Sequence, residues 1–283
     1  MKTNFSLLAF ICFITFVIGC GSKNQTTTNT QTTTNAGTNT TSTGKSNNNQ
    51  PDSVVYYKSV NGCKKEDSCT YIEIVIQKLT SGDQKDAINK AVLDSMCVLN
   101  WTSEGTAPLD MNKVLDTYIN NYVSFVKEND SLSDQKYVFT WFQESDARIE
   151  FQNSNIAVFS LYNFNFLGGA HPNTVTNFMN FDMKTGKVLS LNDIFKPGFE
   201  SKINQILVSE FRKKNNLKPN APLTDGGLFE NSLTLNNNFA FTKEGFMFYY
   251  NNYEIAPYVM GPQVFVIPYS EISDLMINPG IIN

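Results

Sequence analysis

The sequence offers few residues that could carry out catalysis or hold a metal. His171 is the single histidine among 283 residues, which excludes zinc motifs and catalytic arrays that need several imidazoles. Neither a G-x-S-x-G nucleophile elbow nor a C-x-x-C pair occurs. Two carboxylates at a suitable separation could cleave a glycosidic bond, but no spacing in the sequence identifies such a pair. We therefore expect no catalytic residues, no metal and no cofactor, with a carbohydrate-acting hydrolase as the less favoured alternative.

The lone histidine lies in the stretch Gly168-Gly169-Ala170-His171-Pro172, directly after a run of aromatic residues. Two successive glycines favour a tight turn with positive φ angles, and the proline restricts His171 to extended geometry. The structural interpretation is that His171 hydrogen-bonds the backbone of this turn. The functional alternative makes it a proton carrier or a ligand contact, so all five residues are candidate binding residues.

A second stretch, rich in tyrosine, proline and glycine, runs from Tyr253 to Pro262. Its prolines and Gly261 predict a rigid loop between two strands, and rigid loops that carry tyrosine lose little entropy on binding. Glu254 is the one acid inside this stretch, and we expect it to anchor the loop rather than to catalyse. The candidate contact residues are Tyr253, Glu254, Ile255, Ala256, Pro257, Tyr258, Gly261 and Pro262.

Cysteines indicate the compartment in which the chain folds. Cys63 and Cys69 flank a polar turn, and in an exported protein a disulfide between them is the favoured pairing. A two-cysteine metal site is the competing interpretation, but no further ligands lie nearby in the sequence. Cys97 lies on the apolar face of an expected helix and is interpreted as a buried packing residue.

The first twenty residues have the pattern of an export signal. Lys2 precedes an apolar run from Phe5 to Ile18, which is shorter than a membrane span. The run ends in Val17-Ile18-Gly19-Cys20, which resembles the lipobox of bacterial lipoproteins, so we expect Cys20 to be acylated and to anchor the chain in a lipid bilayer. An ordinary signal peptide with an incidental cysteine is the alternative. The expected location is the bacterial cell envelope, outside the cytoplasm, either in the periplasm or at the surface.

The segment after this leader separates it from an acidic folded part. Residues 21–51 contain eleven Thr and seven Asn but no acidic residue, a composition typical of a disordered tether. Without the lysines at positions 2, 23 and 45, 19 basic residues face 26 acidic ones, so residues 52–283 carry seven excess negative charges. This charge does not favour nucleic-acid binding. Residues 39–46 mimic a phosphate-binding loop but lack its first glycine, so we expect no nucleotide.

Hydrophobic spacing predicts the elements that must position these residues. Helical stripes cover 88–99, 111–126 and 199–215, the second with Asp110 as its capping residue. Strand patterns cover 54–57, 71–76, 137–143, 148–152 and 156–166, and two turns that contain glycine, at 183–186 and 242–245, each join two further strands. Strand and helix runs are segregated, which predicts an α+β fold with antiparallel sheets and a few packed helices.

Two motifs carry a resemblance to known proteins. The stretch 168–172, with 181–187 after it, and the stretch 253–262, with 267–271 after it, resemble the ectodomain of the RsiV-like family of lysozyme-binding anti-sigma factors. The N-terminal half is similar to the domain that precedes the catalytic module in PdaC-like peptidoglycan deacetylases. The expected organisation is a lipoprotein signal peptide over 1–20, a disordered tether over 21–51, a PdaC-like domain over 52–172 and an RsiV-like domain over 173–283.

This resemblance implies binding rather than catalysis. In the anti-sigma factors the ectodomain binds lysozyme, whereas in the deacetylases the reaction belongs to a separate metal-dependent domain with several histidines. Because this sequence has one histidine, we expect neither that catalytic domain nor its activity. The resulting hypothesis is a non-catalytic envelope module that binds lysozyme-like muramidases or peptidoglycan fragments. A structural or assembly lipoprotein without a small ligand is the alternative.

Overall fold

A computed structural model describes residues 40–44, 52–129 and 140–283 of this chain. The predicted leader with Cys20, most of the predicted tether and the first part of the strand predicted at 137–143 lie outside the described residues. Within the described ranges, no helix is both long and apolar enough to cross a membrane.

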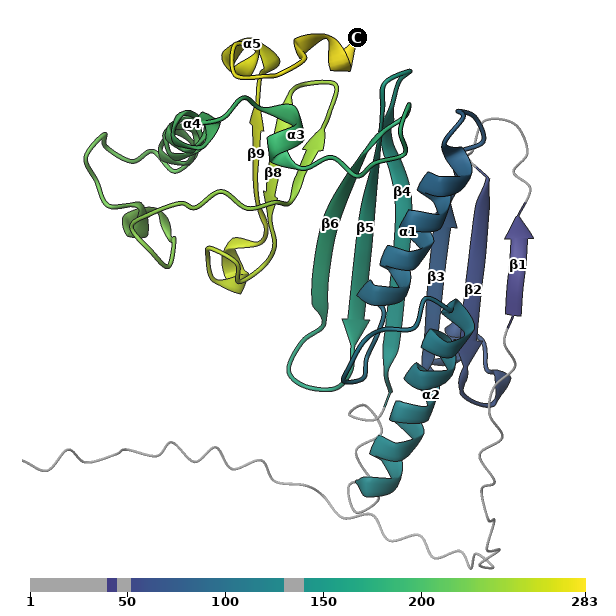
Figure 1. The fold of residues 1–283 in the computed structure, drawn as a ribbon. Helices are drawn as coiled ribbons and strands as arrows, with labels where there is room; N and C mark the ends of the chain where they lie inside the picture. Colours follow the sequence, from purple (N-terminus) through teal and green to yellow (C-terminus); the bar gives the residue numbers. More distant parts are fainter. Residues whose placement is uncertain (1–39, 45–51, 130–139) are drawn as a thin grey trace, which may run out of the picture. The chain divides into compact units, whose positions relative to one another are not determined.

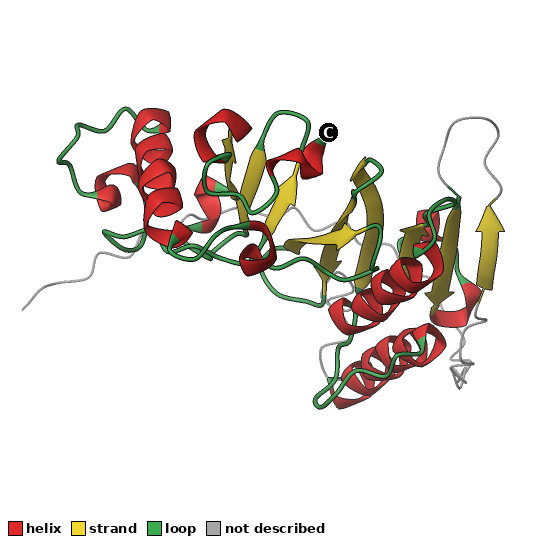
Figure 2. Ribbon diagram, turned by 45° about the horizontal axis from the view of Figure 1, so that its top comes forward, coloured by secondary structure: helices red, strands yellow, loops and turns green. Residues whose placement is uncertain are grey.

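The first part of the fold is a mixed sheet with two long helices on one face (Figures 1 and 2). Its strands, in spatial order, are β1 (Thr40–Gly44), β2 (Ser53–Ser59), β3 (Tyr71–Gln77), β4 (Phe142–Gln152), β5 (Ile156–Phe166) and β6 (Asn173–Asp182). The helices are α1 (Lys85–Leu99) and α2 (Met111–Glu128), and two short 3-10 turns, η1 (Val60–Gly62) and η2 (Lys65–Asp67), lie between β2 and β3.

One strand pair departs from the antiparallel arrangement that the sequence predicts. β3 and β4 run parallel, whereas every other neighbouring pair in this sheet is antiparallel. The reason is the connection: α1 and α2 lie between β3 and β4 in the chain, and a crossover of this length returns the chain in the same direction. The α+β class is confirmed, but the first sheet is mixed.

The helices cover the sheet because both present an apolar stripe. In β3, Ile72, Ile74 and Ile76 alternate onto the helix-facing side and are buried, the period of two that the sequence predicts. The predicted cap of α2 is confirmed, since the Asp110 carboxylate accepts a hydrogen bond of 3.0 Å from the backbone N–H of Asn112. Cys97 is completely buried in this core, and burial raises the pKa of its thiol to about 11, which makes it an inert packing residue.

The second part of the fold is built around a three-stranded antiparallel sheet whose core is rich in phenylalanine. Its strands are β7 (Phe239–Phe241), β8 (Phe246–Tyr250) and β9 (Gln263–Ile267). The helices are α3 (Leu191–Ile194), α4 (Phe199–Lys214) and α5 (Tyr269–Ile272), with the 3-10 turns η5 (Leu223–Gly226), η6 (Tyr258–Met260) and η7 (Pro279–Ile282). Ile156 and Val158 of β5 belong to the same core, so the first sheet supplies part of it.

Two predicted strands are continuous in the structure, and the predicted domain boundary lies at a turn of the first sheet. The strands predicted separately at 137–143 and 148–152 are one strand, β4, from Phe142 to Gln152. The boundary predicted between residues 172 and 173 falls between β5 and β6, which pair with each other in the first sheet. Pairing across a short turn keeps both strands in one sheet, and local sequence patterns did not indicate this.

The two predicted glycine turns have different physical causes. Gly186 has a φ of 73°, as the prediction requires for a left-handed residue. Gly245 is not among the residues with positive φ, so the prediction of the same device there is wrong. A side-chain Cβ at Gly245 would instead lie 2.3 Å from the carbonyl oxygen of Ile267. Glycine is required at this position because β9 approaches the backbone closely.

Candidate functional site

The two motif stretches meet in space. The imidazole of His171 stacks on the phenol ring of Tyr258, with centroids 4.6 Å apart and an angle of 22° between the ring planes. The ring of Tyr253 lies beside that of Tyr258, with the two ring centroids 5.6 Å apart. Tyr253, Tyr258 and Val259 are 54%, 38% and 90% exposed. We call these four residues, His171, Tyr253, Tyr258 and Val259, the aromatic surface.

The turn that carries His171 is held in shape by its two glycines. Gly168 and Gly169 have φ angles of 91° and 108°, which other residues rarely adopt. Nδ1 of His171 lies 3.0 Å from the carbonyl oxygen of Pro172. A carbonyl oxygen only accepts, so Nδ1 of His171 is the donor in this hydrogen bond. The hydrogen bond to the backbone that the structural interpretation predicts for His171 is therefore present.

The second motif forms an irregular loop with one strained residue. Tyr253 has a φ of 64°, which is unfavourable for a residue with a bulky side chain. Pro257 precedes the 3-10 turn η6, and Gly261 follows it with a φ of 65°. Ala256 is buried in the core of the second sheet. Within this motif, Ala256 thus packs into the core, while the rings of Tyr253 and Tyr258 are exposed.

Glu254 holds this loop in place through both carboxylate oxygens. Oε1 accepts a hydrogen bond of 2.8 Å from the side chain of Asn236, and Oε2 accepts one of 2.8 Å from the backbone N–H of Asn251. This geometry agrees with the anchoring role that the sequence analysis favours for Glu254. An acid whose two oxygens are used in this way is poorly placed to act as a proton donor.

Asparagine side chains attach the second sheet to the outer edge of β6. The amide of Asn251 accepts a 2.7 Å hydrogen bond from the Thr176 N–H and donates a 3.0 Å one to the Thr176 carbonyl oxygen. Asn238 accepts from the N–H of Phe178 at 2.9 Å, and Asn180 bonds the backbone of β7 with both ends of its amide, at 2.7 and 3.1 Å. These side chains form hydrogen bonds where a further strand would otherwise pair, so backbone groups at the edge of β6 have hydrogen-bond partners. Because β6 begins directly after the His171 turn, the same asparagine side chains also hold the two motifs close together.

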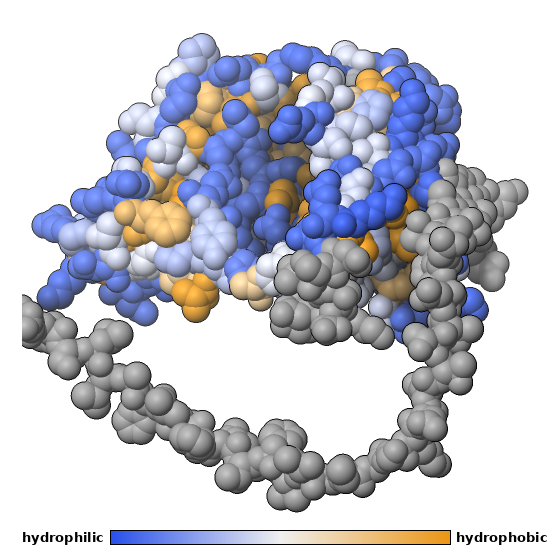
Figure 3. Space-filling model, turned by 90° about the horizontal axis from the view of Figure 1, so that it is seen from below, coloured by the Kyte–Doolittle hydropathy of each residue, from blue (hydrophilic) through white to orange (hydrophobic). Residues whose placement is uncertain are grey.

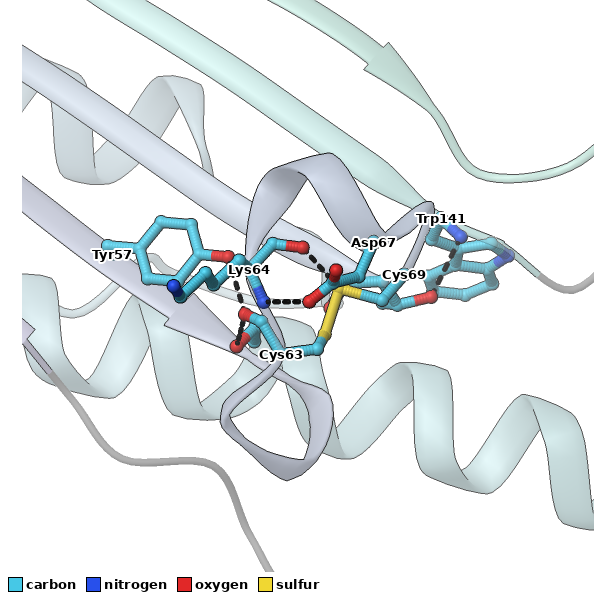
Figure 4. The surroundings of a disulfide bond; sticks show 8 residues. Tyr57, Cys63, Lys64, Asp67, Cys69 and Trp141 are labelled. Atoms are coloured by element: carbon cyan, nitrogen blue, oxygen red, sulfur yellow. Dashed lines mark hydrogen bonds between the residues drawn. A yellow bond between two sulfur atoms is a disulfide. The ribbon is translucent and has the colours of Figure 1, made fainter.

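The disulfide lies at another part of the first sheet. Cys63 and Cys69 are bonded to each other, which is the pairing that the sequence analysis favours. Figure 4 shows the Tyr57 hydroxyl donating to the Cys63 carbonyl at 2.9 Å, and the Lys64 N–H donating to the Asp67 carboxylate at 3.1 Å. Both bonds fix the loop that the disulfide closes.

The disulfide loop also places a lysine over the face of the sheet that is opposite the helices. Nζ of Lys65 lies 2.9 Å from Glu73 and 2.7 Å from Glu144. The Tyr71 hydroxyl donates to Glu144 at 2.5 Å. Burial opposes ionisation of Glu144, but the hydrogen bonds from Lys65 and Tyr71 outweigh it and lower the pKa of that carboxyl. The three charged groups form a compact ion-pair cluster.

The geometry of the aromatic surface suits contact with another molecule. Within the described residues, no three His, Cys, Asp or Glu side chains are grouped so that they could hold a metal ion. On the face shown in Figure 3, apolar residues occur as scattered patches among polar ones, as is usual for a protein surface. Stacked, half-exposed tyrosines differ from such scattered residues, because they offer a rigid and amphipathic contact area.

Some residues of this site were not identified from the sequence. Val259 is the most exposed large apolar residue of the described chain, yet an apolar residue inside a motif is ordinarily interpreted as core. Asn238 and Asn251 lie in asparagine-rich runs, 236–238 and 251–252, which were the available signal. Gly168, Gly169, Pro257 and Gly261 shape the backbone of the two motifs, and Ile255 and Ala256 pack toward the core.

Comparison with known proteins divides the chain into two matched regions. Residues 63–174 match the family described as deacetylase PdaC, and residues 192–270 match the family described as a protein of unknown function, DUF3298. The chain is 26% identical over 115 residues to the peptidoglycan-N-acetylmuramic acid deacetylase PdaC of Bacillus subtilis (strain 168). That match covers 40% of this chain and 24% of the relative, so it spans about a quarter of the relative's length.

Two crystal structures share the fold. A member of the DUF3298 family from Bacteroides fragilis has a TM-score of 0.65 and 19% identity, over 87% of this chain and 94% of that one. A DUF3298 family protein from Pseudomonas aeruginosa PAO1 has a TM-score of 0.57 and 20% identity, over 80% and 94%. The predicted resemblance, a PdaC-like domain followed by an RsiV-like DUF3298 domain, is confirmed. The disulfide and the distant relationship to a peptidoglycan deacetylase are both typical of proteins outside the cytoplasm.

Proposed function

Because the chain joins a PdaC-like domain to a DUF3298 domain, we propose that it is a non-catalytic binding module of the bacterial cell envelope. The observation that supports this proposal most strongly is the convergence of the two motif stretches in one exposed stack, His171 on Tyr258. Stacked rings on a fixed loop lose little freedom when they are covered by a partner. The aromatic surface is the contact area of the module.

The partner that this surface suits best is a protein, namely a lysozyme-like muramidase. Exposed tyrosines beside an apolar residue are typical of the central contacts of protein interfaces. The seven excess negative charges on residues 52–283 would attract a cationic lysozyme and accelerate the encounter. Peptidoglycan fragments, the second expected ligand, have no net positive charge for this field to attract.

Lipid attachment is the proposed means of localisation. Acylation of Cys20 would hold the module at a membrane, and the Thr- and Asn-rich residues between Cys20 and β1 would let it reach a partner in the envelope. Metabolic labelling with a radioactive or alkyne fatty acid tests this point. The label is expected on the wild-type chain and absent from Cys20→Ser, and a labelled Cys20→Ser chain would contradict it.

The binding role is tested with the full chain and purified lysozyme. A pull-down and a calorimetric titration are expected to show saturable binding, and no binding at high micromolar concentration would contradict the lysozyme form of the proposal. Cross-linking in intact cells that recovers another stable protein would instead favour the assembly role. Incubation with peptidoglycan, followed by assays for new reducing ends and released acetate, is expected to yield no product. Product formation would contradict the non-catalytic role.

A further inference from the structure

A groove separate from the aromatic surface lies beside the attachment of the second sheet. Its floor is the face of β4, β5 and β6 that the helices leave open, and its wall is the turn between β7 and β8. The groove has a volume of about 840 Å³, which is within the range of small-molecule sites. None of its lining residues belongs to the aromatic surface.

Charges along the groove nearly balance. Asp146, Glu150 and Glu244 contribute three carboxylates, while Arg148 and Lys243 contribute two cations. Arg148 forms an ion pair with Asp146, its neighbour on the same face of β4. A net charge close to zero gives no strong preference for a charged ligand.

Hydrogen-bonding groups are dense on the floor of the groove. The Ser160 hydroxyl donates to Glu150 at 2.5 Å, which fixes that carboxylate while its other oxygen remains an acceptor. Tyr162 lies on the neighbouring strand and lines the groove, and its phenol, like that of any tyrosine with an ordinary pKa of about 10, is a hydroxyl at neutral pH. Thr176 of β6 adds one more hydroxyl to the floor, whereas the Thr242 hydroxyl of the wall is already bonded within its own turn.

Apolar side chains lie among these polar groups. Phe178 of β6 and Met247 of β8 line the groove and are only partly buried. Alternating hydroxyl, carboxylate and guanidinium groups next to exposed apolar atoms match a sugar ring, whose hydroxyls both donate and accept and whose C–H face is apolar. A purely apolar ligand would leave the polar groups of the floor without partners.

The groove continues along the sheet. A second hollow of about 610 Å³ shares Asp146 and Arg148 with the first and extends over β3 to Lys65 and Glu73. Its further charges, Lys65 against Glu73 and Glu144, bring the excess over both hollows to two carboxylates, which disfavours an anionic ligand and still admits a neutral one. Neighbouring strands lie about 4.8 Å apart, so a path from β6 to β3 crosses three such spacings. A ligand that fills both hollows is a chain of several rings rather than a single ring.

From these observations we infer that the open face of β3 to β6 binds a neutral oligosaccharide, with Glu150 and Arg148 as its main hydrogen-bonding residues. This site is additional to the proposed lysozyme contact and uses other residues. The two proposals therefore fail separately, since saccharide binding does not depend on Tyr258 and lysozyme binding does not depend on Glu150.

In the experiment, the full chain is titrated separately with chitotetraose, cellotetraose and tetralysine. Binding of each probe is monitored by ligand-observed NMR. Saturable binding of either tetrasaccharide in the millimolar range or tighter is the expected result. Binding of tetralysine alone, or of none of the three probes, would overturn the inference.

Two variants locate the site. Glu150→Gln and Arg148→Gln are each expected to weaken tetrasaccharide binding about ten-fold, whereas Glu104→Gln and Lys113→Gln, which remove exposed charges elsewhere, are expected to leave it unchanged. Circular dichroism melts check that each variant is folded. Unchanged affinity in both groove variants would place the saccharide elsewhere and overturn the assignment of this groove.

Discussion

The imidazole of His171 lies flat against the phenol ring of Tyr258, at a centroid distance of 4.6 Å. The two residues belong to motifs that are far apart in the sequence. Their contact therefore depends on other parts of the fold that hold the two motifs side by side. The asparagine bridges to β6, above all Asn251 to Thr176, hold the Tyr258 loop beside the His171 turn. The stack therefore exists before any partner binds, which lowers the entropic cost of binding.

Substitutions of Tyr253 can test stability and binding separately. Its φ of 64° is strained for tyrosine but is readily adopted by glycine. Tyr253→Gly is expected to leave the free energy of unfolding unchanged or to raise it by up to about 1 kcal/mol, since relief of strain offsets the added chain entropy. Tyr253→Ala keeps the strain and loses the ring. Both variants are expected to bind lysozyme more weakly. Urea unfolding and calorimetry measure the two effects, and a Tyr253→Gly chain less stable than Tyr253→Ala would contradict this account.

Glu254 is expected to act on stability and not on chemistry. Glu254→Gln retains one acceptor oxygen and loses the other, so one of the hydrogen bonds from Asn236 and the Asn251 N–H is lost at a cost of about 1 kcal/mol. Urea unfolding measures this loss, with the exposed Glu230→Gln as its control. Equal stability of Glu254→Gln and wild type would show that the carboxylate does not anchor the loop.

The disulfide closes a short loop and is expected to contribute modestly to stability. Replacing both Cys63 and Cys69 by serine should lower the free energy of unfolding by about 2 kcal/mol, mainly because the unfolded chain is no longer constrained. Reduction of the wild type should have the same effect, whereas the double variant should not respond to reductant. A wild type whose urea midpoint is unchanged by reduction would contradict this prediction.

Asp193 links stability to acidic pH. Hydrogen bonds from Lys187 and from Ser190 lower the pKa of its carboxyl to about 2. Since the pKa is lower in the folded state than in the unfolded state, this contribution is fully present above the ordinary carboxyl pKa of about 3.9 and is lost as the pH falls towards about 2. The group is exposed, so the effect should stay below about 1 kcal/mol. Asp193→Asn should reduce the slope of stability against pH in this window, and an unchanged slope would rule out the linkage.

Local patterns were sufficient for much of the fold. Period-two isoleucines located β3, and Asp110 located the start of α2, because each signal depends on neighbours within a few residues. The parallel pairing of β3 with β4 could not be predicted in the same way. It depends on where the chain returns after two helices, which no local pattern encodes.

The candidate site was predictable only in parts. Both motif stretches were recognised from their glycines, prolines and tyrosines, but their contact depends on side-chain amides of Asn238 and Asn251 that bond backbone on β6. Asparagine is common in turns, so its presence near a loop does not indicate a bridge between sheets. The exposure of Val259 could not be predicted for the same reason. The direction in which a loop side chain points depends on the hydrogen bonds that anchor the loop.

A calorimetric titration of the wild-type chain and of Tyr258→Ala with lysozyme tests the central claim most directly. The wild type is expected to bind saturably, Tyr258→Phe to bind nearly as well because it keeps the ring, and Tyr258→Ala to bind about thirty-fold more weakly, as for a central interface residue. Leu109→Ala, which shortens an exposed apolar side chain outside the aromatic surface, should have no effect. Equal affinity of wild type and Tyr258→Ala, or no binding by the wild type, would contradict the claim that the stacked rings form the contact surface.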